Sequence, residues 1–285
     1  MMPSAATART PRRMSPIVLT LNLLLLTLTA QASRVDTVEI YSPSMHKSIP
    51  CIVITPQGYS LQGNPYPTLY LLHGYSGHFA SWLKDAPQLR QHADEYQMLI
   101  VCPDGGYDSW YLDSPVDTSV RYDTHISSEV VRYVDFYYHT RREPAGRAIG
   151  GLSMGGHGAM LLAARHPDVF GAAGSMAGGL DLRRWRSNGW DLKGVLGRPD
   201  THWQNWVDNS AVSWVPVLKA SGQPLLLDCG LDDFFLPDNR EMHRLLVEAE
   251  VPHEYTERPG GHTAEYWGYA ADFQLVFFHR FFTKN

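Results

Sequence analysis

Residues 147–165 read RAIGGLSMGGHGAMLLAAR, and no other stretch of the chain says more about its fold. Its first four residues predict a short buried strand, and residues 156–165 predict a helix because they are rich in alanine and leucine. Ser153 lies at the corner between them, with a glycine two positions away on each side. A serine on a strained strand–turn–helix corner is typical of a nucleophile elbow, where only small neighbours leave room for the backbone. We therefore interpret Ser153 as a catalytic nucleophile, the alternative being a structural glycine-rich turn.

Strand-like runs and helical patterns alternate along the rest of the chain. Continuous apolar runs, which suit strands covered on both faces, occur at 68–72, 98–102 and 225–229. Further strand-like segments occur at 37–41, 48–55 and 253–257, and helical patterns at 126–138, 241–250 and 265–282. Antiparallel strands followed by alternating strands and helices predict an α/β fold with a mostly parallel central sheet and helices on both faces. We expect a single domain.

The N-terminal residues 1–32 have the pattern of a secretory signal peptide. Three arginines precede an apolar run at 17–28, and Ala30-Gln31-Ala32 is a small-x-small cleavage site. The apolar run is short for a membrane span, although a retained anchor helix is the alternative. Ser33 follows the expected cleavage site where a lipoprotein would have cysteine. We therefore expect a secreted or periplasmic catalytic domain at 33–285, with no membrane attachment after removal of the signal.

Composition narrows the classes of partner and cofactor. The net charge of −5, without basic blocks, argues against nucleic acid and anionic membrane surfaces as partners. Cys51, Cys102 and Cys229 lie in or beside apolar runs and suit buried thiols, although one disulfide stays open in an exported protein. The thirteen histidines lack the spacing of a metal site, so we expect no metal and no organic cofactor.

Five tryptophans gather in the segment 180–222, which has weak periodicity and several Gly, Pro and Asn residues. We interpret this segment as a cap insertion over the mouth of the sheet. Tryptophans in a loop-rich segment either line a substrate cleft or cover a core, and the sequence leaves both roles open.

A serine nucleophile needs a base and an acid, which follow it in the order Ser, acid, His in this kind of fold. His262 follows Gly260-Gly261 at the end of a strand, and we predict it as the base. Asp232 and Asp233 follow the strand at 225–229, and one of them should orient His262. Since ligands bind at the carboxyl ends of strands in an open α/β sheet, all three groups are expected at one edge.

An oxyanion formed at Ser153 needs two backbone N–H donors. Met154, which follows the nucleophile, is expected to supply one of them. The other should come from the loop after the strand at 68–72, and we choose Tyr75, with Gly74 and Ser76 as alternatives. We expect a structural part for His73, which begins this loop.

With these motifs assembled, the chain resembles the esterase D-type branch of the α/β-hydrolases. That branch includes S-formylglutathione hydrolases, tributyrin-type esterases, feruloyl and acetylxylan esterases of carbohydrate esterase family 1, and mycolyltransferases of the antigen 85 type. The resemblance covers about residues 35–282. It rests on Leu71-Leu72-His73-Gly74, Ser109-Trp110-Tyr111 with Asp113, the glycine-rich stretch 151–158, Asp228-Cys229-Gly230 with Asp233, and Gly261-His262.

The resemblance implies an α/β-hydrolase fold and favours Asp233 as the catalytic acid, because the family's acid stands four residues after the cysteine. It also implies that Trp110 and Tyr111 lie beside the substrate pocket. One departure is Ala264, where family members usually carry an aromatic residue two places after the histidine. Trp267 stands just beyond it, and we expect Trp267 to contact the substrate as well.

These expectations describe an exported serine esterase that acts through an acyl-enzyme on acyl or feruloyl esters of carbohydrates, with plant polysaccharide as the expected partner. The alternatives are a broad short-chain carboxylesterase, an acyltransferase to a sugar alcohol and a thioesterase like S-formylglutathione hydrolase. Export argues against the last of these. A non-catalytic carbohydrate-binding role is the remaining alternative from another class.

Overall fold

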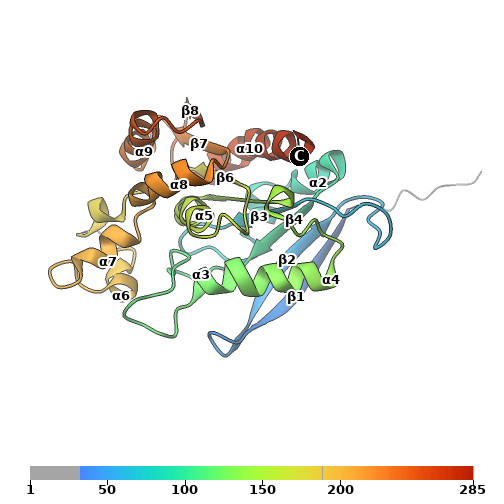
Figure 1. The fold of residues 1–285 in the computed structure, drawn as a ribbon, viewed down its shortest axis with the longest axis horizontal. Helices are drawn as coiled ribbons and strands as arrows, with labels where there is room; N and C mark the ends of the chain where they lie inside the picture. Colours follow the sequence, from blue (N-terminus) through green and yellow to red (C-terminus); the bar gives the residue numbers. More distant parts are fainter. Residues whose placement is uncertain (1–32, 188, 285) are drawn as a thin grey trace, which may run out of the picture. The chain divides into compact units, whose positions relative to one another are not determined.

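An eight-stranded sheet forms the centre of the fold (Figure 1). The computed structural model describes residues 33–187 and 189–284, so the expected signal peptide at 1–32 lies outside the described residues. The strands are β1 (Arg34–Ser42), β2 (Lys47–Thr55), β3 (Thr68–Leu72), β4 (Leu99–Pro103), β5 (Arg147–Leu152), β6 (Ala172–Met176), β7 (Leu225–Gly230) and β8 (Glu254–Arg258). Their spatial order is β1-β2-β4-β3-β5-β6-β7-β8. β2 pairs antiparallel with β1 and β4, and the other pairs are parallel, which confirms the predicted mostly parallel sheet.

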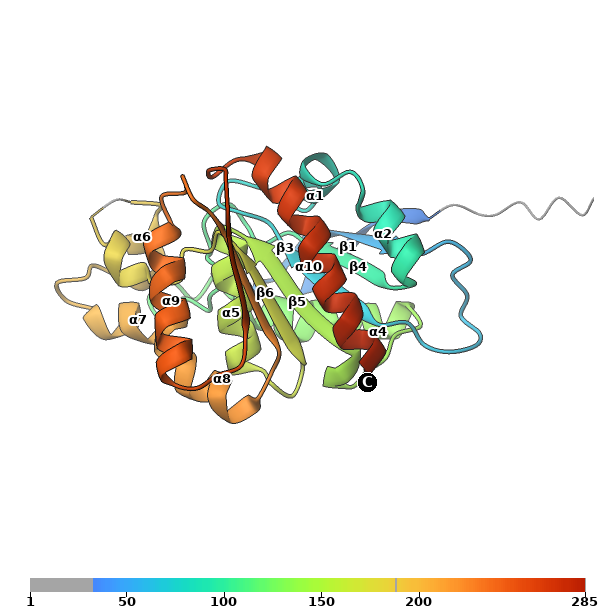
Figure 2. The ribbon, with the colours of Figure 1, turned by 90° about the horizontal axis from the view of Figure 1, so that it is seen from above.

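Helices cover both faces of the sheet, as predicted. One face carries α1 (Ser81–Asp85), α2 (Leu89–Tyr96) and α10 (Ala264–Lys284), which crosses β5 and β6 (Figure 2). The other face carries α3 (Tyr122–Thr124), the π-helical turn η1 (His125–Val130), α4 (Val131–Tyr137), α5 (Met154–Arg165), α8 (Val215–Ser221) and α9 (Leu236–Glu248). A short turn, η2 (Pro144–Gly146), leads into β5. Because helices lie on both sides, β3 to β7 are buried along their whole length.

None of the helices in the described segments combines the length and the apolar character that crossing a bilayer requires. The three cysteines are free and buried, so they do not form the disulfide that the sequence left open. Burial raises the pKa of the Cys102 thiol to about 12 and also raises that of Cys51, which makes both thiols unreactive at neutral pH.

The segment 180–222 forms short helices beside α5 and α9. They are η3 (Leu182–Trp185), α6 (Leu192–Leu196), α7 (Trp203–Asp208) and η4 (Ala211–Trp214), followed by α8. Both roles that the sequence left open occur among its tryptophans, and Trp203 is exposed. Trp206 is buried in the core, and Trp214 packs against the guanidinium of Arg165 at 5.0 Å. Trp190 instead lines the cavity described below, and Trp185 packs against the ring of Trp190.

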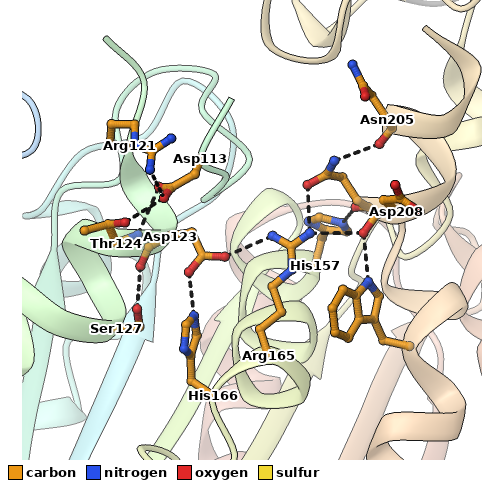
Figure 3. A network of polar contacts seen from close by, with 12 residues as sticks. Asp113, Arg121, Asp123, Thr124, Ser127, His157, Arg165, His166, Asn205 and Asp208 are labelled. Carbon is orange, nitrogen blue, oxygen red and sulfur yellow. Dashed lines mark hydrogen bonds and ion pairs between the residues drawn. The ribbon is translucent and has the colours of Figure 1, made fainter. Parts of the chain in front are cut away.

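A polar network fastens this segment to α5 (Figure 3). Arg165 donates to the backbone carbonyl of Asp208 at 3.0 Å and to the side chain of Asn209 at 2.9 Å. His157, inside the glycine-rich stretch, donates from Nε2 to the Asn209 carbonyl at 2.8 Å. Burial lowers the pKa of His157 to about 4, so its ring stays neutral. The helix behind Ser153 therefore also holds the tryptophan-rich segment.

Asp123 supplies the carboxylate of this network. It accepts hydrogen bonds from Arg165 at 2.9 Å and from His166 at 2.6 Å. Burial acts to raise the pKa of Asp123, but the hydrogen bond from His166 and the charge of Arg165 outweigh burial, so the pKa lies below its usual value. A depressed pKa means that ionised Asp123 stabilises the folded state, and this contribution is lost as the pH falls through the folded-state pKa.

We expect Asp123→Asn to lower the free energy of unfolding by about 3 kcal/mol at pH 7, because Arg165 loses its charged partner in a largely buried site. The two proteins should converge as the pH falls through the folded-state pKa of Asp123, which lies below its ordinary value. Urea denaturation at pH 7 and along a series of decreasing pH values tests this. Asp200→Asn, which removes the carboxylate of an exposed ion pair with Arg198, is the matched control. An equal loss in the control would contradict a special role for Asp123.

Candidate active site

Ser153 stands where β5 ends and α5 begins, with backbone angles φ 57° and ψ −118°. This conformation is strained for a residue with a side chain, and it presents the hydroxyl outside the turn. The flanking glycines are sterically required. A Cβ on Gly155 would clash with the carbonyl oxygens of Leu72 and His73, and a Cβ on Gly151 would clash with the Gly155 carbonyl. The glycine pattern thus reflects the close approach of the α5 N-terminus to the end of β3.

A series of hydrogen bonds joins Ser153 to two loops at the same end of the sheet. His262 Nε2 lies 2.8 Å from Ser153 Oγ, and His262 Nδ1 lies 2.7 Å from Asp233 Oδ2. The Asp233 residue is 4% exposed, and its other carboxylate oxygen accepts from the N–H of Phe235 at 2.8 Å. A carboxylate beside Nδ1 keeps the proton on that nitrogen, which leaves Nε2 free to accept from the serine hydroxyl. Asp232 is exposed, so the structure brings Asp233 and not Asp232 to His262.

The two loops are held together by their strands and by a buried carboxylate. The N–H of Asp232 donates to the carbonyl of Gly260 at 2.9 Å, which crosslinks the loop after β7 to the loop after β8. Gly260 has φ 131°, a conformation that residues with side chains rarely adopt. Asp228, fully buried at the end of β7, pairs with Arg258 of β8 and accepts from the hydroxyl of Tyr266 of α10. These contacts position the loop that carries the histidine against the loop that carries the acid.

The loop after β3 is fixed beside Ser153 by the buried ring of His73. Nε2 of His73 accepts from the N–H of Gly105 at 2.8 Å, so Nδ1 carries the proton and donates to the Gly74 carbonyl at 2.8 Å. Burial lowers the pKa of His73, which keeps the ring neutral. The hydroxyl of Tyr111 donates to the His73 carbonyl at 3.0 Å and completes the support. His73 therefore has the structural part that the sequence suggested.

Tyr111 does not reach the substrate cavity, and the structure does not support the expected contact between Tyr111 and a substrate. Its side chain is fully buried and packs directly against Gly105 and Gly158, where a Cβ on either glycine would clash with the tyrosine ring. Its neighbour Trp110 does line the cavity. Consecutive residues of this turn point to different places, so a motif that contains both cannot say which one faces the cavity.

Near Ser153, the backbone N–H groups of Met154, Gly74 and Tyr75 have no acceptor among the described residues. Met154 is the first residue of α5, where the N–H groups of a helix point outward without intrahelical partners. The N–H of Ser76 is engaged, because it donates to the carbonyl of Tyr107 at 2.8 Å. The loop comes close to Ser153, since a Cβ on Gly74 would lie 3.3 Å from the Cβ of Ser153. Of the three candidate donors in this loop, Tyr75 and Gly74 remain.

A cavity of about 240 Å³ is lined by Ser153, His262 and the loop after β3. Six aromatic residues line it: Tyr75, Trp110, Trp190, Phe234, Phe235 and Trp267. The indole N–H of Trp110 donates to the carbonyl of Trp190 at 3.2 Å, and the rings of Trp190 and Phe234 lie nearly parallel with centroids 5.8 Å apart. The tryptophan-rich segment thus contributes one wall of the cavity.

Trp267 occupies the region where Ala264 departs from the resembled family. Three residues after Ala264 on α10, it lines the cavity, and its ring meets the His262 ring edge-on with centroids 4.8 Å apart. Residues three apart share a helix face, so an aromatic wall is present here in a shifted position.

Trp190, Phe234 and Phe235 line the cavity without having been identified from the sequence as substrate-binding residues. The available signals were the tryptophan cluster and the aromatic pair that follows Asp233. Neither signal separates Trp190, at the cavity, from Trp206, in the core, because the segment has no periodicity that assigns a face.

Comparison with known proteins places the chain in a family. The Esterase family model matches residues 42–274. The chain belongs to this esterase family. The esterase Rv1288 of Mycobacterium tuberculosis is 31% identical over 235 residues, which are 74% of this chain and 51% of that protein. The acetyl esterase of Caldicellulosiruptor saccharolyticus is 25% identical over 211 residues, covering 70% of this chain and 78% of that enzyme.

A solved structure of a ferulic acid esterase superposes with a TM-score of 0.76 at 28% identity and covers 88% of this chain and 99% of that one. The resemblance to esterase D-type α/β-hydrolases and the α/β-hydrolase fold are therefore confirmed. The chain spans about half the length of the first curated relatives that it matches.

In this member of the esterase family, the buried carboxylate of Asp238 holds a tryptophan that packs against the cavity-lining Trp190. Asp238, in the first turn of α9, accepts from the indole N–H of Trp185 at 2.6 Å and pairs with Arg184 at 2.9 Å. Trp185 in turn packs against Trp190, with ring centroids 4.7 Å apart. Burial raises the pKa of Asp238 to about 7, only partly offset by Trp185 and Arg184.

The raised pKa of Asp238 predicts a pH-dependent contribution to stability. Between its unfolded pKa of about 3.9 and its folded pKa, the folded protein holds a proton that the unfolded chain releases. The contribution is therefore full below about pH 4 and declines as the pH rises towards 7. We expect the free energy of unfolding of Asp238→Asn, relative to wild type, to rise by about 3 kcal/mol over this range. Urea denaturation at pH 4, 5.5 and 7 measures the difference, and a constant difference would contradict the assignment.

Proposed function

We propose that this chain is an exported serine esterase that acts through a covalent acyl-enzyme. The main support for the proposal is the series of hydrogen bonds from Ser153 through His262 to Asp233. Ser153 and His262 also line the aromatic cavity. A serine hydroxyl becomes a useful nucleophile only when a base takes its proton and a third group orients that base. Membership of the esterase family supports the same reading.

In the proposed reaction, Ser153 Oγ attacks the ester carbonyl carbon while His262 Nε2 takes the hydroxyl proton. The N–H groups of Met154 and Tyr75 donate to the oxyanion that forms. Asp233 stabilises the imidazolium, which then gives its proton to the departing alcohol. Water, deprotonated by His262, attacks the acyl-enzyme and releases the acid, which restores the serine.

We propose that the acyl group is aromatic, as in a feruloyl ester of a carbohydrate. The side chains of Trp110, Trp190, Phe234 and Trp267 surround the position next to Ser153, and aromatic rings pack favourably against a flat phenolic group. The similarity to a ferulic acid esterase supports this choice, and the similarity to an acetyl esterase keeps short acyl groups as the second candidate. The signal-peptide pattern of residues 1–32 supports a place outside the cytoplasm, where esters of plant polysaccharide are met.

Methyl ferulate and methyl butyrate test the acyl preference, since they share a leaving alcohol. We expect kcat/KM for methyl ferulate to exceed that for methyl butyrate by about tenfold or more. One well-packed aromatic contact contributes an effect of this size. Trp190→Ala should remove most of this preference and leave the rate on methyl butyrate close to wild type. The reverse preference would instead identify a broad short-chain carboxylesterase. Product analysis with added glycerol separates hydrolysis from acyl transfer.

A further inference from the structure

A second cavity, of about 440 Å³, lies away from the candidate active site. Tyrosines form much of its lining: Tyr59, Tyr133, Tyr137 and Tyr138. Arg34 and Asp36 of β1 and the segment that follows β2 complete the walls. It shares no lining residue with the cavity at Ser153, and the proposed reaction does not use it.

The topology of the sheet puts this cavity at the opposite end from Ser153. β2 runs antiparallel to β4, with Cys51 opposite Pro103 and Ile54 opposite Ile100, so Thr55 lies where β4 begins. β4, β3 and β5 are parallel, and Ser153 follows the end of β5. A ligand in the second cavity is therefore bound independently of the catalytic groups.

The tyrosines offer both ring surface and free hydroxyls. The rings of Tyr133 and Tyr137, one turn apart on α4, have centroids 4.5 Å apart, and Tyr137 is 58% exposed. The Tyr59 hydroxyl oxygen accepts from the N–H of His139, and the Tyr138 hydroxyl donates to Asp36 at 3.3 Å. The hydroxyls of Tyr133 and Tyr137 have no partner within the described part of the chain. They are free to hydrogen-bond to a ligand.

The charged groups of the cavity balance each other. Arg34 Nε donates to Asp36, so guanidinium and carboxylate form a neutral pair. The Arg34 side chain is 73% exposed, and its terminal nitrogens can donate further. A neutral pair gives neither an anionic nor a cationic ligand a net electrostatic advantage, but it supplies both donors and acceptors to hydroxyl groups.

We propose that this cavity is a second binding site for a neutral sugar chain. A sugar ring has an apolar C–H face that packs on aromatic rings and hydroxyls that both donate and accept. The tyrosine rings fit the first property, and the free hydroxyls with the Arg34–Asp36 pair fit the second. The volume falls in the usual range for small-ligand sites. Binding at this site requires no esterase chemistry, so the proposal can be tested independently of the proposed reaction.

Calorimetric titration with ester-free xylohexaose, cellohexaose and mannohexaose, each up to 5 mM, tests the proposal on the full chain. We expect at least one hexasaccharide to bind equally to wild type and Ser153→Ala. Tyr137→Ala should weaken that binding at least fivefold. Phe136→Ala is the matched control, because Phe136 is 78% exposed on the same helix and does not line the cavity. Unchanged hydrolysis of methyl butyrate by both α4 variants verifies that they fold.

Three results would overturn the proposal. The first is no binding of any hexasaccharide at 5 mM. The second is binding that Trp190→Ala weakens and Tyr137→Ala does not, which would assign the sugar to the cavity at Ser153. The third is a dimer in sedimentation velocity that Tyr137→Ala dissociates, which would make this surface an interface between two copies of the chain.

Discussion

Ser153→Ala should lower kcat for ester hydrolysis by about 10⁴- to 10⁶-fold, the range found when the nucleophile of a serine hydrolase is removed. The physical reason is that no other hydroxyl is within reach of His262 Nε2, which lies 2.8 Å from Ser153 Oγ in the described structure. The small side chain of alanine leaves the β5–α5 corner sterically unchanged. We therefore expect the melting temperature to stay within a few degrees of wild type. Steady-state kinetics on methyl ferulate and thermal denaturation followed by circular dichroism measure the two quantities.

Ser175→Ala is the matched control for this variant. Ser175 is a second buried serine, in the neighbouring strand β6, and its hydroxyl has no hydrogen-bond partner in the described structure. Its removal should leave kcat close to the wild-type value. If Ser153→Ala kept more than about a tenth of wild-type kcat, the proposed acyl-enzyme would be excluded.

Asp233→Asn should lower kcat by about 10⁴-fold, the size of effect that follows when the wrong histidine tautomer is imposed. The Asp233 carboxylate accepts the proton of His262 Nδ1, whereas an amide at the same place can donate its own N–H to Nδ1. The imidazole proton would then reside on Nε2, facing Ser153, and His262 could not act as the base. KM should change far less than kcat, because Asp233 does not line the substrate cavity.

Asp232→Asn provides the control for this experiment. It makes the same chemical change one residue earlier, on an exposed side chain, and should leave kcat within about twofold of wild type. Equal losses in the two variants would point to a general disturbance of the loop after β7 and would contradict the proposed role of Asp233. A large loss in Asp232→Asn alone would transfer that role to Asp232.

The sequence predicts Ser153, His262 and Asp233, the three residues of the proposed catalytic series, to different extents. Ser153 and its elbow depend on steric demands within a few residues, so the motif is visible without the fold. His262 is predicted from a glycine-rich loop at a strand end. The choice between Asp232 and Asp233 is different, because both have the same chemistry and the same loop. The residues alone left it open, and only the resemblance to a family favoured one of them.

The aromatic residues show where local pattern stops being informative. Trp110 and Tyr111 are consecutive, and both have positive φ, yet one lines the cavity and the other is enclosed beneath the loop after β3. Trp190 and Trp206 come from one segment of similar composition, and they serve the cavity and the core respectively. Irregular backbone has no fixed period, so the direction of each side chain depends on what packs against it.

The sequence alone predicts the α/β order of elements, the mostly parallel sheet and the sharp corner at Ser153. These properties follow from hydrophobic periodicity and from short-range sterics, which act between residues close in the chain. Contacts between distant parts of the chain set which carboxylate meets His262, which aromatic rings surround Ser153, and where the tyrosine-lined cavity lies relative to the sheet. Those arrangements join residues more than twenty positions apart, and their distances depend on strand pairing and helix packing that no local pattern contains.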